Sequence, residues 1–379
     1  MSIDNNVSPL LHNNLIRRSS LSPKGKAPSK VTVTMNLFNL PVGSKASLVK
    51  KNSSYRVNVN IPGNILGKHL SFNKVPIRRI QRKDFKKQTK EKNNNYDNGR
   101  RLKHTRVNFV PKKIELKIQE RPTPPFDFDY QQKEGEILDR PINVFAPDDR
   151  YIYQDTSFPW RTVGRVDTPL GSCTGCTIGP RLLLTANHCI QWNSDNTAGW
   201  VRFRPSYYNG STPFGEAWAS LVIYWTKVTP GDGLSDQETA FDYVVCVLDN
   251  RIGDILGYPG YRSYNSNWNG GSYWQHMGYP SDLSGGERPA FQGDCIISTT
   301  NTKSTSGQEG LVLGHFNDTV PGHSGGPIWG WWEGEEWPRV VGVASAEAKT
   351  PAMNTSGDNE FGGGQGLSSL ITWARDNFP

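Results

Sequence analysis

Short runs of apolar and β-branched residues, separated by polar turns, dominate the second half of the chain. Residues of the turn-forming kinds Gly, Asn, Asp and Pro lie between these runs, which cover residues 181–186, 200–204, 218–226, 243–248 and 339–344. Strands that return at roughly ten-residue spacing with turn residues between them are typical of an all-β sandwich or barrel. Residues 367–377 (LSSLITWARDN) have the apolar spacing of a helix instead, so we expect one helix to close the chain.

The first 142 residues follow a different pattern. Residues 1–30 are rich in Ser, Asn, Pro and Lys and lack the apolar density that offsets the entropy of ordering, so we predict that they are disordered. Alternating runs at residues 31–40 (VTVTMNLFNL) and 55–61 (YRVNVNI) predict two strands. Residues 74–106 are dense in Lys, Arg and Asn, which indicates a solvated linker or a surface for an anionic partner.

Charge divides the chain at the same place. The 379 residues carry a formal net charge of +8, but residues 1–142 hold 29 Lys and Arg against 11 Asp and Glu, which leaves 14 against 24 for residues 143–379. All 12 Trp and all 5 Cys lie in the second part. We therefore expect a basic, largely disordered N-terminal region followed by one large all-β unit. No apolar run approaches the roughly 18 residues of a membrane-spanning helix, which excludes a transmembrane helical protein.

Three short motifs carry groups that can act together in nucleophilic catalysis. An apolar run ends in His188 (LLLTANHC), Asp242 opens the run FDYVVCVL, and Ser324 lies in the Gly-rich stretch PGHSGGP. A serine hydroxyl is a weak nucleophile unless a base takes its proton, and that base needs a carboxylate to fix its tautomer. His188, Asp242 and Ser324 supply one group of each kind, so we predict that they are the catalytic residues.

The glycines beside Ser324 fit the same chemistry. Gly322 and Gly325 permit a turn that presents the backbone N–H groups of residues 322 and 324 to one point beside the hydroxyl. A tetrahedral intermediate would place its oxyanion there, and each such donor lowers the barrier by about 3 kcal/mol in comparable sites. We therefore assign the oxyanion hole to Gly322 and Ser324.

The motifs TANHC and GHSGGP, in the chain order His, Asp, Ser, resemble those of chymotrypsin-like (trypsin-like) serine peptidases. The segments GSCTGCTIGPRLLLTANHC, FDYVV, GYPSD and NDTVPGHSGGP are similar to the glutamyl endopeptidase branch, and the resemblance covers residues 143–379. It implies a double β-barrel with the catalytic cleft between a first barrel, residues 143–255, and a second, residues 270–379. It also implies peptide-bond hydrolysis through an acyl-enzyme, with no metal and no organic cofactor.

The resemblance further implies a disulfide between Cys173 and Cys189, which lie at the spacing of the family's bridge behind the catalytic His. A loop of this size stabilises a fold by about 3 kcal/mol in the chain-entropy model. Cys176, Cys246 and Cys295 leave an odd thiol, and both a Cys246–Cys295 bridge and buried free cysteines stay open.

Residues expected around the specificity pocket favour different substrate side chains. Asp318 lies six residues before the nucleophile, where trypsin-like enzymes hold the carboxylate that selects Arg or Lys, and Thr319 follows it as in the glutamyl branch. That branch places a His where this chain has Ala344. We expect Ser345 and Glu347 in the pocket wall, where a carboxylate would repel an acidic substrate side chain. Basic and acidic preferences both stay open.

The basic region 1–142 has three interpretations: a propeptide held on the acidic unit by charge, an anion-binding tether, or a solvated linker. We favour a propeptide that acts as an intramolecular inhibitor, because the resembling branch is made as zymogens and its mature start matches a point near Asn143. Nucleic acid is not favoured as a partner, since aromatic residues do not alternate with the basic runs. The disulfide calls for an oxidising compartment, so we expect secretion, although no signal-peptide core is visible.

Two classes of function follow from these features. The first is a serine endopeptidase that acts on proteins or peptides, and the second is an inactive peptidase-fold binding protein with a basic, anion-binding arm. The presence of all three candidate catalytic residues favours the first class. We expect His276 and His323 to be structural, because no pair with metal-ligand spacing completes a site around them.

Overall fold

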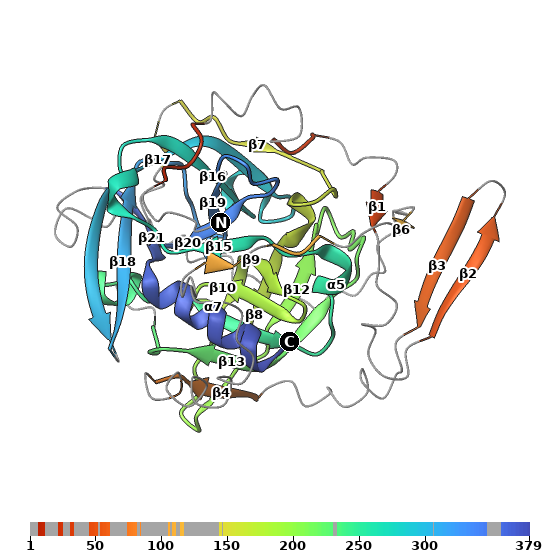
Figure 1. Ribbon diagram of the computed structural model, residues 1–379. Coiled ribbons are helices and arrows are strands. Elements are labelled where there is room, and N and C mark those ends of the chain that lie inside the picture. Colours follow the sequence, from red (N-terminus) through yellow and green to blue (C-terminus); the bar gives the residue numbers. More distant parts are fainter. Residues whose placement is uncertain are drawn as a thin grey trace, which may run out of the picture.

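The computed structural model describes residues 7–11, 22–25, 31–33, 45–51, 54–60, 74–81, 84, 105–106, 108–110, 114–116, 144–145, 147–229, 233–305, 307–346 and 358–379. Figure 1 shows two groups of strands next to each other, with the C-terminal helix α7 (Gln365–Asn377) lying across them. Each group closes into a six-stranded antiparallel barrel. The expected all-β double barrel with one closing helix is confirmed.

Six antiparallel strands close the first barrel, in the order β13, β12, β8, β9, β10, β14 and back to β13. Every residue of β10 and β14 is buried, and all of them are apolar except Thr185. The helix α7 packs against β14 and shares its core. The strands are β8 (Val163–Thr168), β9 (Gly171–Gly179), β10 (Leu182–Thr185), β12 (Arg202–Pro205), β13 (Ala217–Tyr224) and β14 (Val244–Leu248).

The second barrel closes in the order β19, β16, β17, β18, β21, β20 and back to β19. Trp268, Trp274 and Trp332 are each at most 2% exposed and pack against one another in its core. The strands are β16 (Ser272–Gly278), β17 (Ala290–Thr305), β18 (Gln308–His315), β19 (Pro327–Gly330), β20 (Arg339–Ala346) and β21 (Asn359–Gly363).

Shorter elements connect and flank the barrels. β15 runs parallel to β20, β7 pairs with β17, and β11 lies beside the first barrel. Their bounds are β7 (Tyr151–Ile152), η3 (Trp160–Thr162), β11 (Thr197–Ala198), α4 (Asp236–Thr239), α5 (Gly253–Leu256), β15 (Gly260–Arg262), η4 (Ser266–Trp268) and α6 (Ser281–Ser284). No helix in the described ranges is long and apolar enough to cross a membrane.

Parts of the N-terminal region form strands and contact the barrels. The predicted strand at residues 55–61 is found as β3 (Ser54–Asn60), which pairs with β2 (Lys45–Lys51). Of the predicted strand at residues 31–40, the first three form β1 (Val31–Val33), which pairs with β6 (Ile114–Leu116), and residues 34–40 lie outside the described residues. The prediction of disorder for residues 1–30 does not hold for residues 7–11 and 22–25. The Leu10 N–H donates to Trp331 O over 2.7 Å, and Gln154 N donates to Lys24 O over 2.9 Å.

The interpretation of residues 74–106 as a solvated linker is also wrong for part of that segment. Within that segment, β4 (Val75–Arg79) pairs with both β13 and β11, and β5 (Thr105–Arg106) pairs with β15. The basic side chains had suggested full solvation, but the apolar residues between them supply a buried face.

Cys173 and Cys189 form the disulfide that the resemblance implied, with Cα atoms 6.5 Å apart. Cys176, Cys246 and Cys295 are buried and unbridged, so the alternative of buried free cysteines is the correct one. Burial raises the pKa of the Cys176 and Cys246 thiols to about 12, which keeps both protonated and unreactive near neutral pH.

Candidate active site

His188 and Asp242 are brought together by two neighbouring strands of the first barrel. His188 follows β10 and Asp242 precedes β14, and these strands pair so that Thr185 lies opposite Val244. Asp242 Oδ2 lies 2.6 Å from His188 Nδ1, and Asp242 Oδ1 accepts a 2.8 Å hydrogen bond from the His188 backbone N–H. With the carboxylate as acceptor, Nδ1 carries the proton of the neutral ring, and Nε2 is left as the basic nitrogen.

Asp242 accepts a further hydrogen bond from the second barrel. Ser345 Oγ donates to Asp242 Oδ2 over 2.6 Å, and Asp242 is completely buried. A buried carboxylate needs such donors to offset the loss of water. This contact joins residues 103 positions apart in the chain, so no local pattern reveals it. The expected place of Ser345 in the pocket wall stays a prediction.

Ser324 follows a turn whose residues match its geometry. The His323 backbone N–H donates to Val320 O over 3.0 Å, and Gly322 has φ +98°. A proline and a glycine occupy the second and third positions of this turn, as suits a type II turn. A Cβ on Gly322 would lie 2.2 Å from Tyr279 O, so the backbone leaves room for glycine alone.

Two backbone N–H groups at the turn have no acceptor among the residues that the structure describes. Among the hydrogen bonds of the described residues, the N–H groups of Gly322 and Ser324 donate to no backbone or side-chain oxygen. Unpaired donors beside a serine hydroxyl are what a developing oxyanion requires. His323 steadies the turn, because its Nδ1 accepts a 3.0 Å hydrogen bond from the Val320 N–H.

The turn lies against the segment that carries His188. Cys189 Sγ is 4.0 Å from Ser324 O, and a Cβ placed on Gly325 would come within 2.8 Å of Ala186 N. These contacts fall on both sides of His188 in the sequence. The structure therefore brings the three candidate catalytic residues into one region at the junction of the two barrels.

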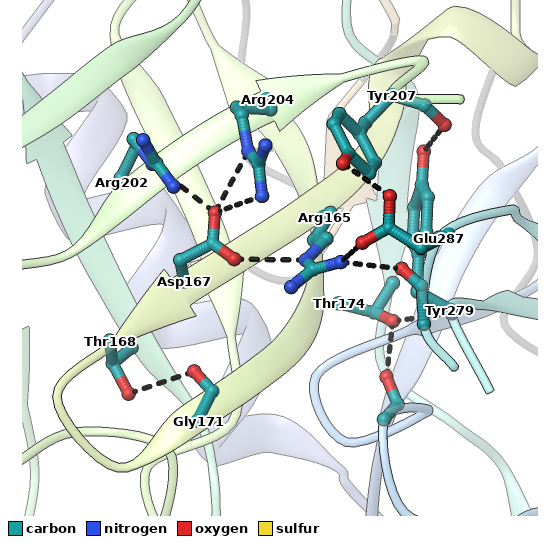
Figure 2. Close-up of polar contacts among 12 residues, drawn as sticks. Arg165, Asp167, Thr168, Gly171, Thr174, Arg202, Arg204, Tyr207, Tyr279 and Glu287 are labelled. Carbon is teal, nitrogen blue, oxygen red and sulfur yellow. Dashed lines mark hydrogen bonds and ion pairs between the residues drawn. The ribbon is translucent and has the colours of Figure 1, made fainter. Parts of the chain in front are cut away.

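Thr174 in β9 holds the turn from the first barrel. Its backbone N–H donates to Ser324 O and its hydroxyl donates to Gly322 O, both over 2.7 Å. The same hydroxyl accepts a 2.9 Å hydrogen bond from the Tyr279 N–H, as Figure 2 shows. Thr174 is completely buried, and Thr185 Oγ1 donates to its carbonyl oxygen over 2.7 Å. One threonine thus fixes the carbonyl groups of two residues in the turn, a role that the sequence did not indicate.

Charged side chains anchor the stretch around Tyr279 (Figure 2). Arg165 in β8 forms an ion pair with Asp167 at 2.9 Å and another with Glu287. Glu287 Oε2 accepts a hydrogen bond from the Tyr207 hydroxyl over 2.5 Å, and the Tyr279 hydroxyl donates to Tyr207 O over 3.0 Å. The network joins the first barrel to the segment between β16 and β17, so Tyr279 is held at both its backbone and its ring.

Three buried histidines pack close to the turn. The rings of His276 and His323 lie 5.1 Å apart, and His315 stacks on Phe361 with 3.9 Å between ring centroids. Burial lowers the pKa of all three imidazoles, that of His276 to about 4. They are therefore neutral near pH 7, which suits the acceptor role of His323 Nδ1.

Asp318 is buried and both its carboxylate oxygens are engaged. It is 1% exposed, Oδ1 accepts from the Phe145 N–H over 2.7 Å, and Oδ2 accepts from Gln292 Nε2 over 2.9 Å. Burial raises the pKa of its carboxyl group. The ring of Phe145 meets Phe316 edge-on at 5.3 Å, which helps to hold residue 145 beside Asp318.

Other candidates for the specificity pocket lie in different settings. Ala344 exchanges backbone hydrogen bonds with the turn, accepting from Gly325 N over 2.8 Å and donating to Gly326 O over 2.9 Å. The hydroxyl of Thr319 is buried and has no partner among the described residues. Glu347 lies outside the residues that the structure describes.

The profile of the family described as Trypsin matches residues 150–357. The chain belongs to this family of serine peptidases, as the resemblance had indicated.

Among curated proteins, the chain is 31% identical over 188 residues to the glutamyl endopeptidase of Bacillus licheniformis, covering 49% of this chain and 54% of that protein. It is 25% identical over 201 residues to the extracellular metalloprotease of Bacillus subtilis, covering 50% and 58%. The chain therefore spans little more than half the length of the curated relatives it matches.

Solved structures of peptidases are also similar. A Glu endopeptidase in complex with MPD matches with TM-score 0.48 and 20% identity, covering 62% of this chain and 99% of that one. The protease Anisep from Arthrobacter nicotinovorans matches with TM-score 0.39 and 17% identity, covering 59% and 99%. At these scores the likeness adds nothing to the fold, which follows from the strand order of the two barrels.

Proposed function

We propose that this protein is a serine endopeptidase with His188, Asp242 and Ser324 as its catalytic residues. The observation that carries the proposal is the pair of contacts from Asp242 to His188, next to the glycine turn of Ser324. One oxygen of the carboxylate lies 2.6 Å from His188 Nδ1, and the other accepts from the His188 N–H over 2.8 Å. Family membership supports the same chemistry.

In the proposed reaction, His188 Nε2 takes the proton of the Ser324 hydroxyl as Ser324 Oγ bonds to the carbonyl carbon of the substrate. The imidazolium that forms is stabilised by Asp242 through Nδ1–H. The carbonyl oxygen becomes an oxyanion and accepts hydrogen bonds from the N–H groups of Gly322 and Ser324. His188 then gives its proton to the leaving amine as the peptide bond breaks, and a water molecule releases the acyl group by the reverse sequence.

A metal is not part of this proposal. The Bacillus subtilis relative is named a metalloprotease, but no group of three or more His, Cys, Asp or Glu side chains in the described ranges could hold a metal ion. The described residues therefore do not fit a metal centre, and we assign no catalytic step to one.

Asp318 is not, in our proposal, the carboxylate that selects a substrate side chain. A basic P1 residue would have to compete with the Phe145 N–H and Gln292 for a carboxylate that is 1% exposed. Breaking such buried hydrogen bonds leaves donors unpaired, which costs about 1–3 kcal/mol each. We therefore expect no preference for cuts after Arg or Lys.

Maturation is the finer part of the proposal. We infer that cleavage near residue 142 separates the basic N-terminal region from the peptidase unit, which leaves Phe145 and its hydrogen bond to Asp318 close to the new N-terminus. The opposite charges of the two parts favour their association before cleavage. Comparing the rate of peptide hydrolysis before and after this cleavage tests whether the N-terminal region inhibits the peptidase unit. The name of the Bacillus subtilis relative supports an extracellular location.

A peptide-library digest tests the proposal. The full chain, before and after processing, is incubated with proteome-derived peptides, and the residue before each cut is read by mass spectrometry. We expect cuts that disappear in Ser324→Ala and that do not follow Arg or Lys. If the processed protein makes no Ser324-dependent cuts, the alternative of an inactive binding protein is favoured. Cuts after Arg or Lys would indicate that Asp318 selects the substrate side chain.

A further inference from the structure

Residues 74–81 of the basic region are built into the first barrel. Figure 1 shows β4 beside β13, and the register pairs residues 77–79 with residues 222–224 in parallel. On its other side, β4 pairs antiparallel with β11, through residues 75–76 and 197–198. The segment therefore occupies a slot between two strands of the peptidase unit.

Two aliphatic side chains anchor the segment in the core. Val75 is 3% exposed and Ile80 is fully buried, and both belong to the main apolar core of the barrels. The Ile80 N–H donates to Tyr224 O over 2.9 Å, which continues the pairing one residue beyond the strand. Loss of the segment would open this core to water and uncover an edge of β13.

Basic residues of the segment are also engaged. Arg78 lies over the ring of Trp373 in α7 at 4.5 Å, and Arg79 Nε donates to Trp225 O over 2.9 Å. Lys74 pairs with Asp195 at 2.6 Å, but both side chains are well exposed, so this pair contributes little. The attachment depends on apolar burial and backbone pairing more than on charge.

We infer that residues 74–81 are a permanent strand of the peptidase unit, which stays bound after the chain is cut between residue 81 and residue 143. The slot between β11 and β13 is thus a binding surface for one extended segment of this chain. The mature enzyme then consists of two associated pieces. This inference refines the proposed maturation, but its basis is the packing of β4 and not the catalytic chemistry.

The strand also supports the segment before the candidate base. The bond from Arg79 fixes Trp225 O at the end of β13. Immediately after it, Thr226 O accepts from Asn187 Nδ2 over 2.7 Å, and Asn187 Oδ1 accepts from Val228 N over 2.9 Å. Asn187 is completely buried and precedes the candidate base, so release of β4 is expected to lower activity as well as stability.

Excision of the segment from the full chain tests the inference. Recognition sequences for a specific protease are inserted within residues 62–68 and within residues 92–98 of the Ser324→Ala chain, which prevents self-digestion. After cleavage, size exclusion at about 1 M salt, where the Debye length is about 3 Å, removes pieces held by charge alone. We expect the freed piece to elute with the rest of the chain in a 1:1 ratio by intact mass. Elution of the piece as a separate peak would overturn the inference.

Two matched variants identify what holds the piece. The double substitution Val75→Ser with Ile80→Ser keeps every charge but removes both aliphatic anchors, each worth on the order of tenfold to hundredfold in affinity. We expect this variant to release the piece, and Lys74→Ala to retain it. Retention by the double variant at about 1 M salt would contradict the role of apolar burial in holding the piece. The assay reads association and not hydrolysis, so failure of the proposed peptidase function would leave its result unaffected.

Discussion

Substitution of Thr174 by valine is expected to lower the catalytic rate while leaving the fold intact. Valine has nearly the shape of threonine, so it fills the same buried site, but it removes the hydroxyl that donates to Gly322 O and accepts from Tyr279 N. Two buried groups then lose their partner, at a cost of about 1–3 kcal/mol for each unsatisfied group. The backbone bond from Thr174 to Ser324 O remains.

Only part of that cost falls on the transition state. If about 1–2 kcal/mol of it appears as looser placement of the oxyanion donors, kcat falls by about five- to thirtyfold, at 1.36 kcal/mol for each factor of ten. KM is expected to change little, because no contact to the bound substrate is removed. The conservative variant Thr174→Ser keeps the hydroxyl and is expected to stay within about threefold of the wild type.

The assay measures kcat and KM on one peptide substrate for wild type, Thr174→Val and Thr174→Ser, with thermal unfolding of each. Labelling by a phosphonylating probe counts the fraction of competent sites, so that a partly folded sample is not read as a slow enzyme. A folded Thr174→Val variant with the kcat of wild type would refute the role of this hydroxyl in holding the turn. Equal losses in the valine and serine variants would also refute it.

Three further predictions concern neighbouring parts of the site. Gly322 has φ +98°, and an added Cβ would lie 2.2 Å from a carbonyl oxygen, so Gly322→Ala should lower kcat by about a hundredfold or more. The control is Gly285→Ala, where φ is +60° and a Cβ would meet open space. This control should lose only about 1 kcal/mol of stability and keep its kcat. Ser345→Ala removes a 2.6 Å donor to Asp242 and should lower kcat about tenfold, corresponding to a loss of about 1.5 kcal/mol; unchanged kinetics would remove Ser345 from the site. Burial holds the pKa of His276 at about 4 in the folded protein against 6.5 as its ordinary value, so the unfolded chain binds a proton first, and this ring alone should lower the free energy of unfolding by about 3 kcal/mol as pH drops from 6.5 to 4. The buried rings of His315 and His323 add to the loss in the same direction. Urea unfolding at pH 7.5 and 4.5 measures this loss, and His276→Gln should reduce it; an equal loss in both proteins would assign the effect to other groups.

Local features of the sequence were enough to predict an all-β unit with one closing helix, and the motifs that resemble those of chymotrypsin-like peptidases implied its two barrels. The apolar runs of β10 and β14, and the helix α7, stand where the periodicity of the chain indicated them. The motifs around His188 and Ser324 could be recognised in the sequence because only neighbouring residues, at a strand end and in a tight glycine turn, determine the backbone conformation there.

Residues that act across long stretches of chain could not be predicted in this way. Thr174 reaches Gly322 across 148 residues, and its place in a β-strand gives no sign of a second role. The bond from Ser345 to Asp242 could not be predicted either, because the two residues lie in different barrels and 103 positions apart in the chain. The composition of residues 74–106 indicated a solvated linker or a surface for an anionic partner because basic residues dominate it, although Val75 of β4 belongs to the core.

The most direct test of the central claim is the covalent labelling of Ser324. The processed protein is treated with a phosphonylating probe and digested with a separate peptidase, and the modified residue is located by peptide mapping. The account predicts one adduct, on the Ser324 hydroxyl, that is lost in Ser324→Ala and strongly reduced in His188→Ala. A folded, processed protein that takes up no label at Ser324, or labels equally without His188, would contradict it.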